Sequence, residues 1–374
     1  MRIGFDAKRV FHNATGLGNY SRDVLRILAS RLPEHAYVAY SPRPGALPAE
    51  AGAGAVEVRG PRSPLARALP ALWRTRLLVR DLRADRIDVF HGLSNELPLG
   101  IEGSGVASAV TIHDLIFERL PELYSSVDRR IYAAKARSAV RRAGVVVAVS
   151  EQTRRDLVEL YGVDPARVRV VYQTCREAFR APIAPERLRE AAARLELPER
   201  FLLAVGTLER RKNLLLALRA LEKLPGVLLV AVGRPTPYAE ELVSFARAHG
   251  LASRVRLLSG VSTPDLAALY RLATVSLYPS LFEGFGIPIV EALFSGTPVV
   301  TTRGGCFAEA GGPGSAYVDP DDADGLRETL ARLLEDAGAR ARMREEGLRH
   351  AARFSDDAIA DGLWRAYADA LARR

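Results

Sequence analysis

The chain is poor in cysteine, in lysine and in long apolar runs. Its 374 residues include only Cys175 and Cys306, which lie far apart, so a disulfide scaffold and a four-cysteine metal site are excluded. No uninterrupted apolar run reaches the length of about 18 residues that suggests a membrane span. The first residues, MRIGFDAKRV, contain no long apolar segment after their charges, so we expect no signal peptide and a cytoplasmic protein.

The scarcity of lysine bears on the positive charge. The formal net charge is +9, which favours a polyanionic partner such as nucleic acid, anionic lipid or a phosphorylated substrate. Only four of the 53 basic residues are lysine, so a general preference for arginine is an alternative explanation. We expect no nucleic-acid partner, because the arginines are scattered and no aromatic stacking platform or known reader motif is present.

The length and the alternation of apolar runs predict an α/β protein with two domains. Hydrophobic residues make up 48% and charged residues 26%, and 374 residues exceed what one ordinary core holds. Short β-branched runs recur with helical stretches between them, which is typical of parallel sheets covered on both faces. The predicted strands are 2–7, 37–41, 56–60, 88–92, 108–114, 145–150 and 168–172, then 201–206, 227–233, 255–260, 274–280, 298–302 and 316–320.

We therefore predict two doubly wound, Rossmann-like domains, residues 1–176 and 177–354. Prolines and a lack of strand formers place the linker at about 175–200. A last helix, 355–374, is capped by Ser355 and is expected to pack back onto the first domain. In doubly wound sheets ligands bind beyond the carboxyl ends of the strands, so two such domains facing each other form a cleft.

The segment PSLFEGFGIPIVEALFSGTPVV (279–300) combines a glycine turn with two carboxylates. Gly284 and Gly286 let backbone N–H groups approach a ligand, and a helix that begins near Ile287 favours an anion at its N-terminus. Glu283 before the turn and Glu291 on the helix then flank a phosphate site and can accept hydrogen bonds from sugar hydroxyls. The alternative is a solvated loop glutamate and a helix-capping one.

The segment VGTLERRKN (205–213) places a basic cluster after a predicted strand that ends at Gly206. Fixed cations at such a position stabilise a leaving diphosphate without a metal. We expect Lys212 and the inward-pointing arginine of the pair, Arg211 rather than Arg210, to fill this role. Asn213 is the expected N-cap of the helix that follows. The alternative is a surface turn.

In the first half, ATGLGNYSRDVL (14–25) follows the first strand. Gly16 and Gly18 precede a helix expected to begin near Tyr20 and form a second backbone cradle. The dinucleotide fingerprint fails because Ser21 stands where the third glycine belongs, and a plain flexible loop is the alternative. Asn19 is an acceptor-side candidate.

Polar side chains also follow later strands of the first half. TIHDL (111–115) places His113 and Asp114 at a strand end, where the imidazole can hydrogen-bond a sugar hydroxyl. Asn95 is a less specific candidate, and His91 is interpreted as structural. 

In AVSEQTRRDL (148–157), Ser150 is either a helix cap or a ligand contact, and both interpretations stay open. Arg154 lies in the first turns of the same predicted helix. Both are acceptor-side candidates.

Together these motifs resemble one family. The glycine loop at Gly16–Gly18, TIHDL, AVSEQTRRDL, GTLERRKN, SGVSTPDLAALY and above all EGFGIPIVEA are similar to retaining, metal-independent glycosyltransferases of the two-domain GT-B type. This large family, the glycosyl transferases of group 1, includes bacterial mannosyl- and glucosyltransferases. The resemblance covers nearly the whole chain.

The resemblance implies that the C-terminal domain holds a nucleotide sugar and the N-terminal domain an acceptor. It implies that Arg211 and Lys212 bind the diphosphate, Glu291 the ribose and Glu283 the transferred sugar, with His113 near the anomeric centre. The catalytic candidates are Arg211, Lys212, Glu283 and His113. The remaining donor-binding candidates are Gly16, Gly18, Gly206, Val261, Gly284, Phe285, Gly286 and Ile287.

The implied reaction is transfer of a hexose from GDP-mannose or a UDP-hexose to a glycan or lipid-linked saccharide, in surface polysaccharide or glycoconjugate synthesis. No cofactor or metal is expected. Two carboxylates could suggest glycoside hydrolysis, but hydrolases need no arginine–lysine pair beside an anion site. A nucleotide-sugar epimerase on the same scaffold is the alternative, and the spacing of the two glutamates argues against it.

Two segments depart from the family pattern, RGGCFAEAGGPGSA (303–316) and VVYQTC (170–175). We expect neither to affect the diphosphate-binding set.

The segment 61–88 carries seven arginines. Arg76, Arg80 and Arg83 fall on one helical face, and a basic amphipathic helix could bring the protein to an anionic membrane as a peripheral contact. Packing on its own sheet is the alternative. The expected apolar stripe is Leu69, Leu72, Trp73 and Leu77.

Overall fold

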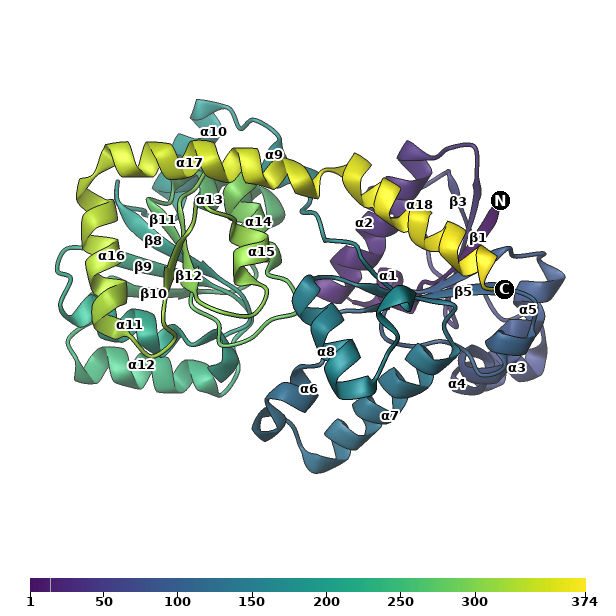
Figure 1. Ribbon diagram of the computed structural model, residues 1–374. Helices are drawn as coiled ribbons and strands as arrows, with labels where there is room; N and C mark the ends of the chain where they lie inside the picture. The colour runs from purple at the N-terminus through teal and green to yellow at the C-terminus, as the bar shows by residue number, and fades with distance from the viewer. Residues whose placement is uncertain (14) are drawn as a thin grey trace. The chain divides into compact units, whose positions relative to one another are not determined.

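The computed structural model describes residues 1–13 and 15–374, and the chain divides into two compact units (Figure 1). Unit 1 comprises Met1–Thr174 and Phe354–Arg374, and unit 2 comprises Cys175–Arg353. The sequence had placed this boundary after residue 176. Each unit is built around one parallel sheet, so the predicted fold class, α/β with two Rossmann-like domains, is confirmed.

Every predicted strand is present. The inner strands of each sheet are mostly apolar and buried, whereas the four edge strands are only partly buried. The order in unit 1 is β3-β2-β1-β4-β5-β6-β7, and in unit 2 it is β10-β9-β8-β11-β12-β13. Unit 1 contains β1 (Arg2–Asp6), β2 (Ala36–Tyr40), β3 (Val56–Arg59), β4 (Val89–Gly92), β5 (Ala107–Ile112), β6 (Val145–Ala148) and β7 (Val168–Val170). Unit 2 contains β8 (Phe201–Val205), β9 (Leu228–Val232), β10 (Val255–Leu258), β11 (Val275–Tyr278), β12 (Val299–Thr302) and β13 (Ala316–Val318).

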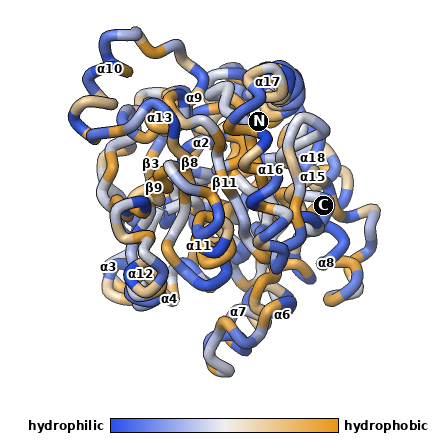
Figure 2. The backbone as a smooth tube through the Cα atoms, turned by 90° about the vertical axis from the view of Figure 1, so that its left-hand side faces the viewer, coloured by the Kyte–Doolittle hydropathy of each residue, from blue (hydrophilic) through white to orange (hydrophobic). Residues whose placement is uncertain are grey.

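Helices surround both sheets (Figure 1). Figure 2 shows hydrophilic and hydrophobic stretches alternating along helices such as α7, as expected where one face meets water. Unit 1 contains α1 (Lys8–His12), α2 (Gly16–Arg31), α3 (Pro64–Ala68), α4 (Pro70–Leu72), α5 (Leu78–Ala84), α6 (Ile116–Arg119), α7 (Ser126–Arg142), α8 (Glu151–Tyr161) and α18 (Asp356–Ala372). Unit 2 contains α9 (Glu177–Arg180), α10 (Pro185–Arg194), α11 (Leu214–Glu222), α12 (Tyr238–Ala248), α13 (Thr263–Leu272), α14 (Ile287–Phe294), α15 (Phe307–Gly311), α16 (Ala323–Glu335) and α17 (Ala337–Ala351).

The C-terminal helix α18 belongs to the core of unit 1. Ser355 caps it by accepting a hydrogen bond from the Ala358 N–H at 3.3 Å. Ile359, Leu363 and Tyr367 are buried in the same cluster as residues of β1 and α2. This burial holds the last turns of the chain on the first sheet.

The segment predicted as a linker, 175–200, is instead part of unit 2. It forms α9 and α10, which pack on α13. The Arg271 guanidinium donates to the Ala181 carbonyl at 2.8 Å, and Arg194 pairs with Asp265 at 2.5 Å. Of the three prolines that suggested a linker, Pro185 begins α10, whereas Pro182 and Pro198 lie in the loops on either side of that helix.

The strand order reverses between β1 and β4 in unit 1 and between β8 and β11 in unit 2. Ligands of doubly wound sheets bind at this reversal, outside the carboxyl ends of the strands. The basic turn 206–212 follows β8, and the loop 279–286 follows β11. The sequence motifs of unit 2 therefore meet at the reversal point of their sheet.

The basic segment 61–88 does not form the single amphipathic helix that was predicted. It is divided into α3, α4, a π-helical turn η2 (Trp73–Leu77) and α5, with a break at Leu69. Trp73 is 1% exposed and its indole N–H donates to Asp81 at 2.6 Å, whereas Leu69 and Leu72 are exposed. Among the described residues, none of the helices has both the length and the apolar character that a bilayer span requires.

Candidate functional site

The basic turn after β8 is shaped by Gly206. Its φ is +150°, and a Cβ at this position would lie 3.2 Å from Cε of Lys212. The lysine side chain therefore passes directly over the end of β8. The Leu281 N–H donates to the Arg211 carbonyl at 2.9 Å, which joins this turn to the loop after β11.

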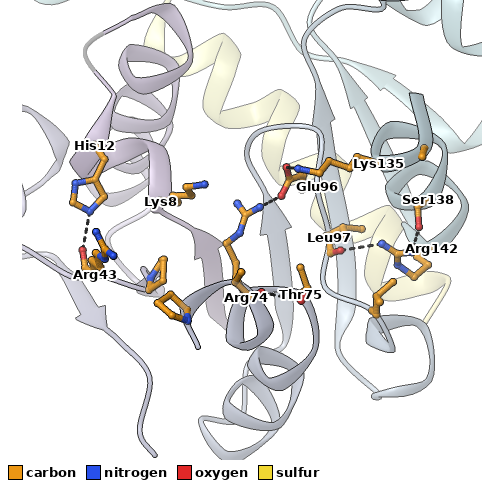
Figure 3. A pocket seen from close by; sticks show the side chains of 15 residues that line it. Lys8, His12, Arg43, Arg74, Thr75, Glu96, Leu97, Lys135, Ser138 and Arg142 are labelled. Atoms are coloured by element: carbon orange, nitrogen blue, oxygen red, sulfur yellow. Dashed lines mark hydrogen bonds and ion pairs between the residues drawn. The ribbon is translucent and has the colours of Figure 1, made fainter. Parts of the chain in front are cut away.

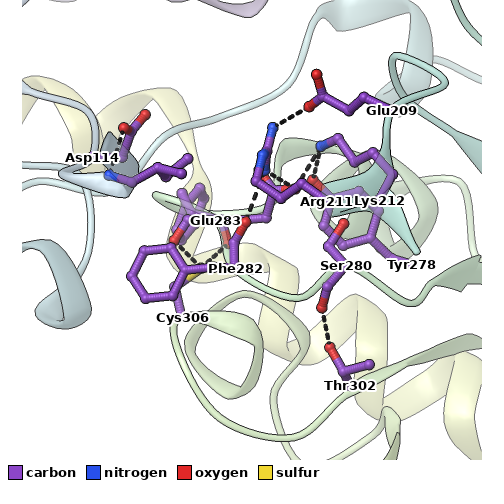
Figure 4. A network of polar contacts seen from close by, with 12 residues as sticks. Asp114, Glu209, Arg211, Lys212, Tyr278, Ser280, Phe282, Glu283, Thr302 and Cys306 are labelled. Atoms are coloured by element: carbon purple, nitrogen blue, oxygen red, sulfur yellow. Dashed lines mark hydrogen bonds and ion pairs between the residues drawn. The ribbon is translucent and has the colours of Figure 1, made fainter. Parts of the chain in front are cut away.

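Arg211, Lys212 and Glu283 form one polar network (Figure 4). Lys212 Nζ and Arg211 Nη1 each lie 2.6 Å from the same atom, Glu283 Oε1. Nη1 also donates to the Phe282 carbonyl at 2.8 Å, so the guanidinium is held by the backbone of the loop as well. Two cations thus converge on one carboxylate at the carboxyl ends of the central strands.

Tyr278 and Glu209 complete this network. Lys212 Nζ donates to the Tyr278 hydroxyl at 3.0 Å and lies 4.9 Å from the centre of that ring. Arg211 Nη2 pairs with Glu209 at 2.6 Å. Neither Tyr278 nor Glu209 was named from the sequence, although Tyr278 lies near the end of the predicted strand 274–280 and is the last residue of β11, and such positions lie at the edge where ligands bind.

The electrostatics keep Glu283 ionised. Burial alone would raise the pKa of this carboxyl, but Lys212 and Arg211 lower the pKa to about 2. Burial would likewise lower the pKa of Arg211, and the charge of Glu283 raises it instead. Glu283 and Arg211 are therefore charged at neutral pH, and the basic side chains are positioned before any ligand arrives.

The helix after the glycine turn begins as predicted. Gly286 has φ +114° and lies at the N-cap of α14, which starts at Ile287 with a proline in its first turn. Glycine is favoured here because a side chain rarely adopts this backbone conformation. The helix dipole makes the start of α14 an anion-binding end, with the Ile287 N–H as its first backbone donor. Pro288 carries no N–H, and the Ile289 N–H donates to the Gly286 carbonyl at 2.9 Å.

Glu291 is buried on the inner face of α14. Its Oε2 accepts a hydrogen bond from the buried Tyr270 hydroxyl at 3.0 Å. Tyr270 ends the motif SGVSTPDLAALY on α13, so that motif and the second glutamate meet in the fold. Val261 is half-buried in the turn before α13, which Ser262 caps.

Asn213 does not cap α11 with its side chain. It has φ +54°, and its amide nitrogen donates to the Pro320 carbonyl at 2.7 Å. The residue occupies the predicted N-cap position of α11, but its side chain closes the basic turn onto a distant loop instead of bonding the helix.

In unit 1, His113 is buried at the end of β5. Its Nε2 lies 2.9 Å from the Leu93 carbonyl and therefore carries the proton, which leaves Nδ1 to accept from the Gln173 amide at 3.3 Å. Burial lowers the pKa of His113 to about 4, so the ring is neutral. A hydrogen bond from this ring to a sugar hydroxyl requires that Leu93 or Gln173 be released.

His91 is structural, as the sequence suggested. Its two nitrogens lie 2.9 Å from the Tyr367 hydroxyl and 2.8 Å from the Thr111 hydroxyl, and burial lowers its pKa to about 3. Thr111 also bonds the Tyr20 hydroxyl at 2.9 Å. This buried chain links α2, β4, β5 and α18 within one core.

The expected glycine loop is helical. Gly16 and Gly18 lie in the first turn of α2, which begins at Gly16 and not near Tyr20. A Cβ on Gly18 would lie 1.8 Å from the Asn13 carbonyl oxygen, whereas Gly16 has nothing within 4 Å. Gly18 therefore permits a close backbone approach, and Ala14 of the motif lies outside the described residues.

The acceptor-side candidates have local structural partners. Asn95 accepts from the His113 N–H at 3.1 Å, and Asn19 accepts from Arg22 at 2.6 Å. Asp114 accepts from the Ile116 N–H at 3.2 Å. The other two lie on one helix: Ser150 caps α8 through the Thr153 N–H at 3.0 Å, and Arg154 pairs with Glu151 at 3.2 Å.

The two departures from the family pattern both contact candidate residues, although neither of these contacts involves Arg211 or Lys212. The Cys306 thiol donates to the Phe285 carbonyl at 2.8 Å, and burial raises its pKa. Gln173 of the segment VVYQTC bonds His113. Each departure therefore supports a loop of the site, which a comparison of motifs alone did not reveal.

No group of three or more His, Cys, Asp or Glu side chains able to hold a metal ion occurs within residues 1–13 and 15–374. The geometry thus brings Arg211, Lys212, Glu283 and the start of α14 together in unit 2. It gathers His113, Asn95 and Gln173 separately in unit 1.

Two family models match the chain, one in each half. The model described as Glycosyltransferase Family 4 matches residues 14–174, and the model described as Glycosyl transferases group 1 matches residues 188–350.

Curated relatives match parts of the chain. An MMP α-(1→4)-mannosyltransferase of Mycolicibacterium hassiacum is 40% identical over 128 residues, which cover 33% of this chain and 31% of the relative. A D-inositol 3-phosphate glycosyltransferase of Acidothermus cellulolyticus is 31% identical over 233 residues, 59% of this chain and 52% of the relative. The matched part thus spans about a third to a half of these relatives.

The fold is shared over the whole chain. The crystal structure of Anabaena HepE in complex with UDP and glucose has a TM-score of 0.76 at 20% identity and covers 98% of both chains.

Proposed function

Since the chain belongs to the glycosyltransferases described as group 1 and family 4, we propose that it transfers a hexose from a nucleotide diphosphate sugar to a saccharide acceptor. The donor is GDP-mannose or a UDP-hexose, and the acceptor is a glycan or a lipid-linked saccharide of surface polysaccharide or glycoconjugate synthesis. The reaction retains the anomeric configuration and uses no metal ion.

The observation that carries the proposal is the network of Arg211, Lys212 and Glu283 beside the start of α14. Two fixed cations and a helix N-terminus provide the positive charge that a leaving diphosphate needs. A glycoside hydrolase would have no use for this arrangement, because its leaving group carries no such charge.

The proposed step conserves atoms and charge. The bond between the sugar C1 and the diphosphate oxygen breaks while the acceptor oxygen bonds C1 on the same face. The proton of the acceptor hydroxyl passes to the departing phosphate oxygen, so no protein base is needed. Arg211 and Lys212 stabilise that oxygen, while Glu283 orients the sugar and Glu291 binds the ribose.

A thermal-shift panel of UDP, GDP and ADP with their sugar conjugates tests the proposal, since a ligand that binds the folded state raises the melting temperature. We expect one nucleotide and its sugar conjugate to raise the melting temperature of the protein while chelator is present. The protein is then incubated with the nucleotide sugar that raises its melting temperature and with a saccharide acceptor. NMR of the product should show that the anomeric configuration of the transferred sugar is retained. Epimerisation of the donor without any acceptor would contradict the assignment.

A further inference from the structure

Unit 1 contains a cavity of about 730 Å³ that the sequence motifs did not predict (Figure 3). Its walls include segments that follow β1, β2 and β4, together with η2 and α7. Ligands of doubly wound sheets bind at this edge, and the volume lies within the range of small-molecule sites. None of the acceptor-side candidates is among the described residues that line it.

The lining is strongly cationic. Two of the four lysines of the chain are there, so a general preference for arginine does not explain the charge. Figure 3 shows Lys8, Arg74 and Lys135 extending toward the same space. The cations of the lining are Lys8, Arg43, Arg74, Lys135 and Arg142, and its one carboxylate is Glu96.

Ion pairs balance this charge only in part. Glu96 is shared between Arg74 and Lys135, whose Nζ lies 3.1 Å from Oε1. Arg74 also lies 3.3 Å from Asp6, and Arg142 Nε lies 3.8 Å from Glu102 Oε2. Within the part of the chain that the structure describes, Lys8 and Arg43 form no ion pair. Arg74 foremost, then burial and Arg9, lower the pKa of Lys8, as expected where positive charges repel.

The cavity is preformed and partly apolar. The His12 imidazole donates to the Arg43 carbonyl at 3.0 Å, and the Leu99 N–H donates to the Thr75 carbonyl at 2.7 Å. An ion alone would leave most of the volume empty, so the occupant has an organic part beside its charge. The apolar lining consists of Pro42, Pro70, Ala71, Leu97, Leu99 and Ala134.

We propose that this cavity binds the phosphate or diphosphate group of a phosphorylated acceptor, an inference that rests on the proposed transferase function. A phosphate carries about −1.5 to −2 charges at neutral pH, whereas a carboxylate carries one. Lysine ammonium groups and arginine forks are the usual phosphate ligands. The five cations of the lining exceed the three carboxylates that pair with them, Glu96, Asp6 and Glu102, and this excess of positive charge matches a phosphoryl group.

Calorimetry with inorganic pyrophosphate tests this site, with excess UDP and GDP present to fill the donor site. Lys8→Ala/Lys135→Ala should weaken pyrophosphate binding at least tenfold. Lys223→Ala/Arg247→Ala removes two charges outside the cavity and should bind as the unmodified protein does. Equal affinity in all three proteins would overturn the proposal.

The source of the phosphate is found by competition with pyrophosphate. A hexose 6-phosphate in solution and phosphatidylcholine vesicles containing a polyprenyl phosphate are compared. Competition by either one, lost in Lys8→Ala/Lys135→Ala, supports the site and identifies the class of acceptor, and competition by neither contradicts it. Binding of UDP and GDP is measured separately. If neither nucleotide binds but pyrophosphate still binds in a way that depends on Lys8 and Lys135, the transferase function is contradicted and the anion site is not.

Discussion

At the scale of single residues, the account depends on the sharing of one carboxylate by two cations. Lys212 and Arg211 both contact Glu283 Oε1 within 2.6 Å, in a buried setting. Removal of one member of a buried charge group is costly because it leaves the others uncompensated. Substitution of Lys212, Arg211 or Glu283 should therefore change both the reaction rate and the free energy of unfolding, and the two effects can be measured separately.

Glu283→Gln should lower kcat by about 10²- to 10³-fold, as loss of one preorganised polar contact does elsewhere. The affinity for UDP or GDP should hold or increase, because the cations lose their internal counter-charge. Steady-state kinetics and calorimetry separate the two effects. Glu241→Gln, which removes the exposed partner of Arg210, should leave both quantities unchanged. A near-normal kcat in Glu283→Gln would refute its role.

Lys212→Ala should weaken binding of the nucleotide at least tenfold and also reduce kcat, because the lysine contacts the ground-state diphosphate and the leaving group alike. The pKa of Glu283 should rise, since one of the two cations that lower it is lost. Arg210→Ala, in the same turn but exposed, is the matched control. Identical affinities in the two variants would exclude Lys212 from the diphosphate site.

At the scale of elements, the first turn of α2 offers a sharp comparison between two glycines. Gly18→Ala should destabilise unit 1 by about 1–3 kcal/mol, because its Cβ would lie 1.8 Å from a backbone oxygen. A Cβ on Gly16 would have no atom within 4 Å, so Gly16→Ala should have the melting temperature of the unmodified protein. Thermal unfolding of both variants decides this, and equal melting temperatures would contradict the close approach.

The strand ends of β4 and β5 should make the stability depend on pH. The pKa values of His91 and His113 are about 3 and about 4 in the folded state, below the ordinary value of 6.5. Below pH 6.5 the unfolded chain binds more protons, so the free energy of unfolding should fall by up to about 1.4 kcal/mol per pH unit for each histidine. The loss should extend from pH 6.5 down toward pH 4.

Urea unfolding between pH 7 and pH 5 measures this slope. The slope of the free energy of unfolding against pH gives the number of protons taken up on unfolding. His113→Asn should lower this number by about one, and His249→Asn, which alters an exposed histidine, should not. A flat stability profile in the unmodified protein would show that these rings are charged or open to water.

The sequence predicted the strands well and the helix boundaries less well, for physical reasons. Strands such as β5 and β6 are buried on both faces, so hydrophobicity alone marks them. Gly18 in the first turn of α2 lies close to the Asn13 carbonyl, and the glycine spacing alone did not place it inside a helix. The break at Leu69 does have a local signal, because Pro70 disfavours the helical conformation of the residue before it. In this segment the proline is a better guide than the helical spacing of the arginines.

The candidate site was also predicted only in part from the sequence. The cluster of Arg211, Lys212 and Glu283 was predicted because a strand end precedes each motif. The supporting contacts of Cys306 and Gln173 join segments far apart in the chain, and the sequence predicted only that these segments leave the diphosphate-binding set unaffected. The cationic cavity was missed because its residues come from several separate segments.

At the scale of the whole molecule, the net charge of +9 still allows peripheral contact with an anionic membrane. Arg76, Arg80 and Arg83 are exposed, as are Leu69 and Leu72, although Trp73 is not available for such a contact. We predict that the protein floats with vesicles rich in anionic lipid at low salt, and that Arg76→Glu/Arg80→Glu/Arg83→Glu abolishes this. Absence of binding at low salt would end the membrane hypothesis.

The central claim is that a nucleotide diphosphate is neutralised by Arg211, Lys212 and the helix that begins at Ile287, without divalent ions. A crystal structure obtained with UDP or GDP in the presence of chelator tests it most directly. The account predicts a phosphoryl oxygen within hydrogen-bond distance of Lys212 Nζ and of the Ile287 N–H at the start of α14. A nucleotide bound far from both, or bound only when Mg²⁺ is supplied, would contradict it.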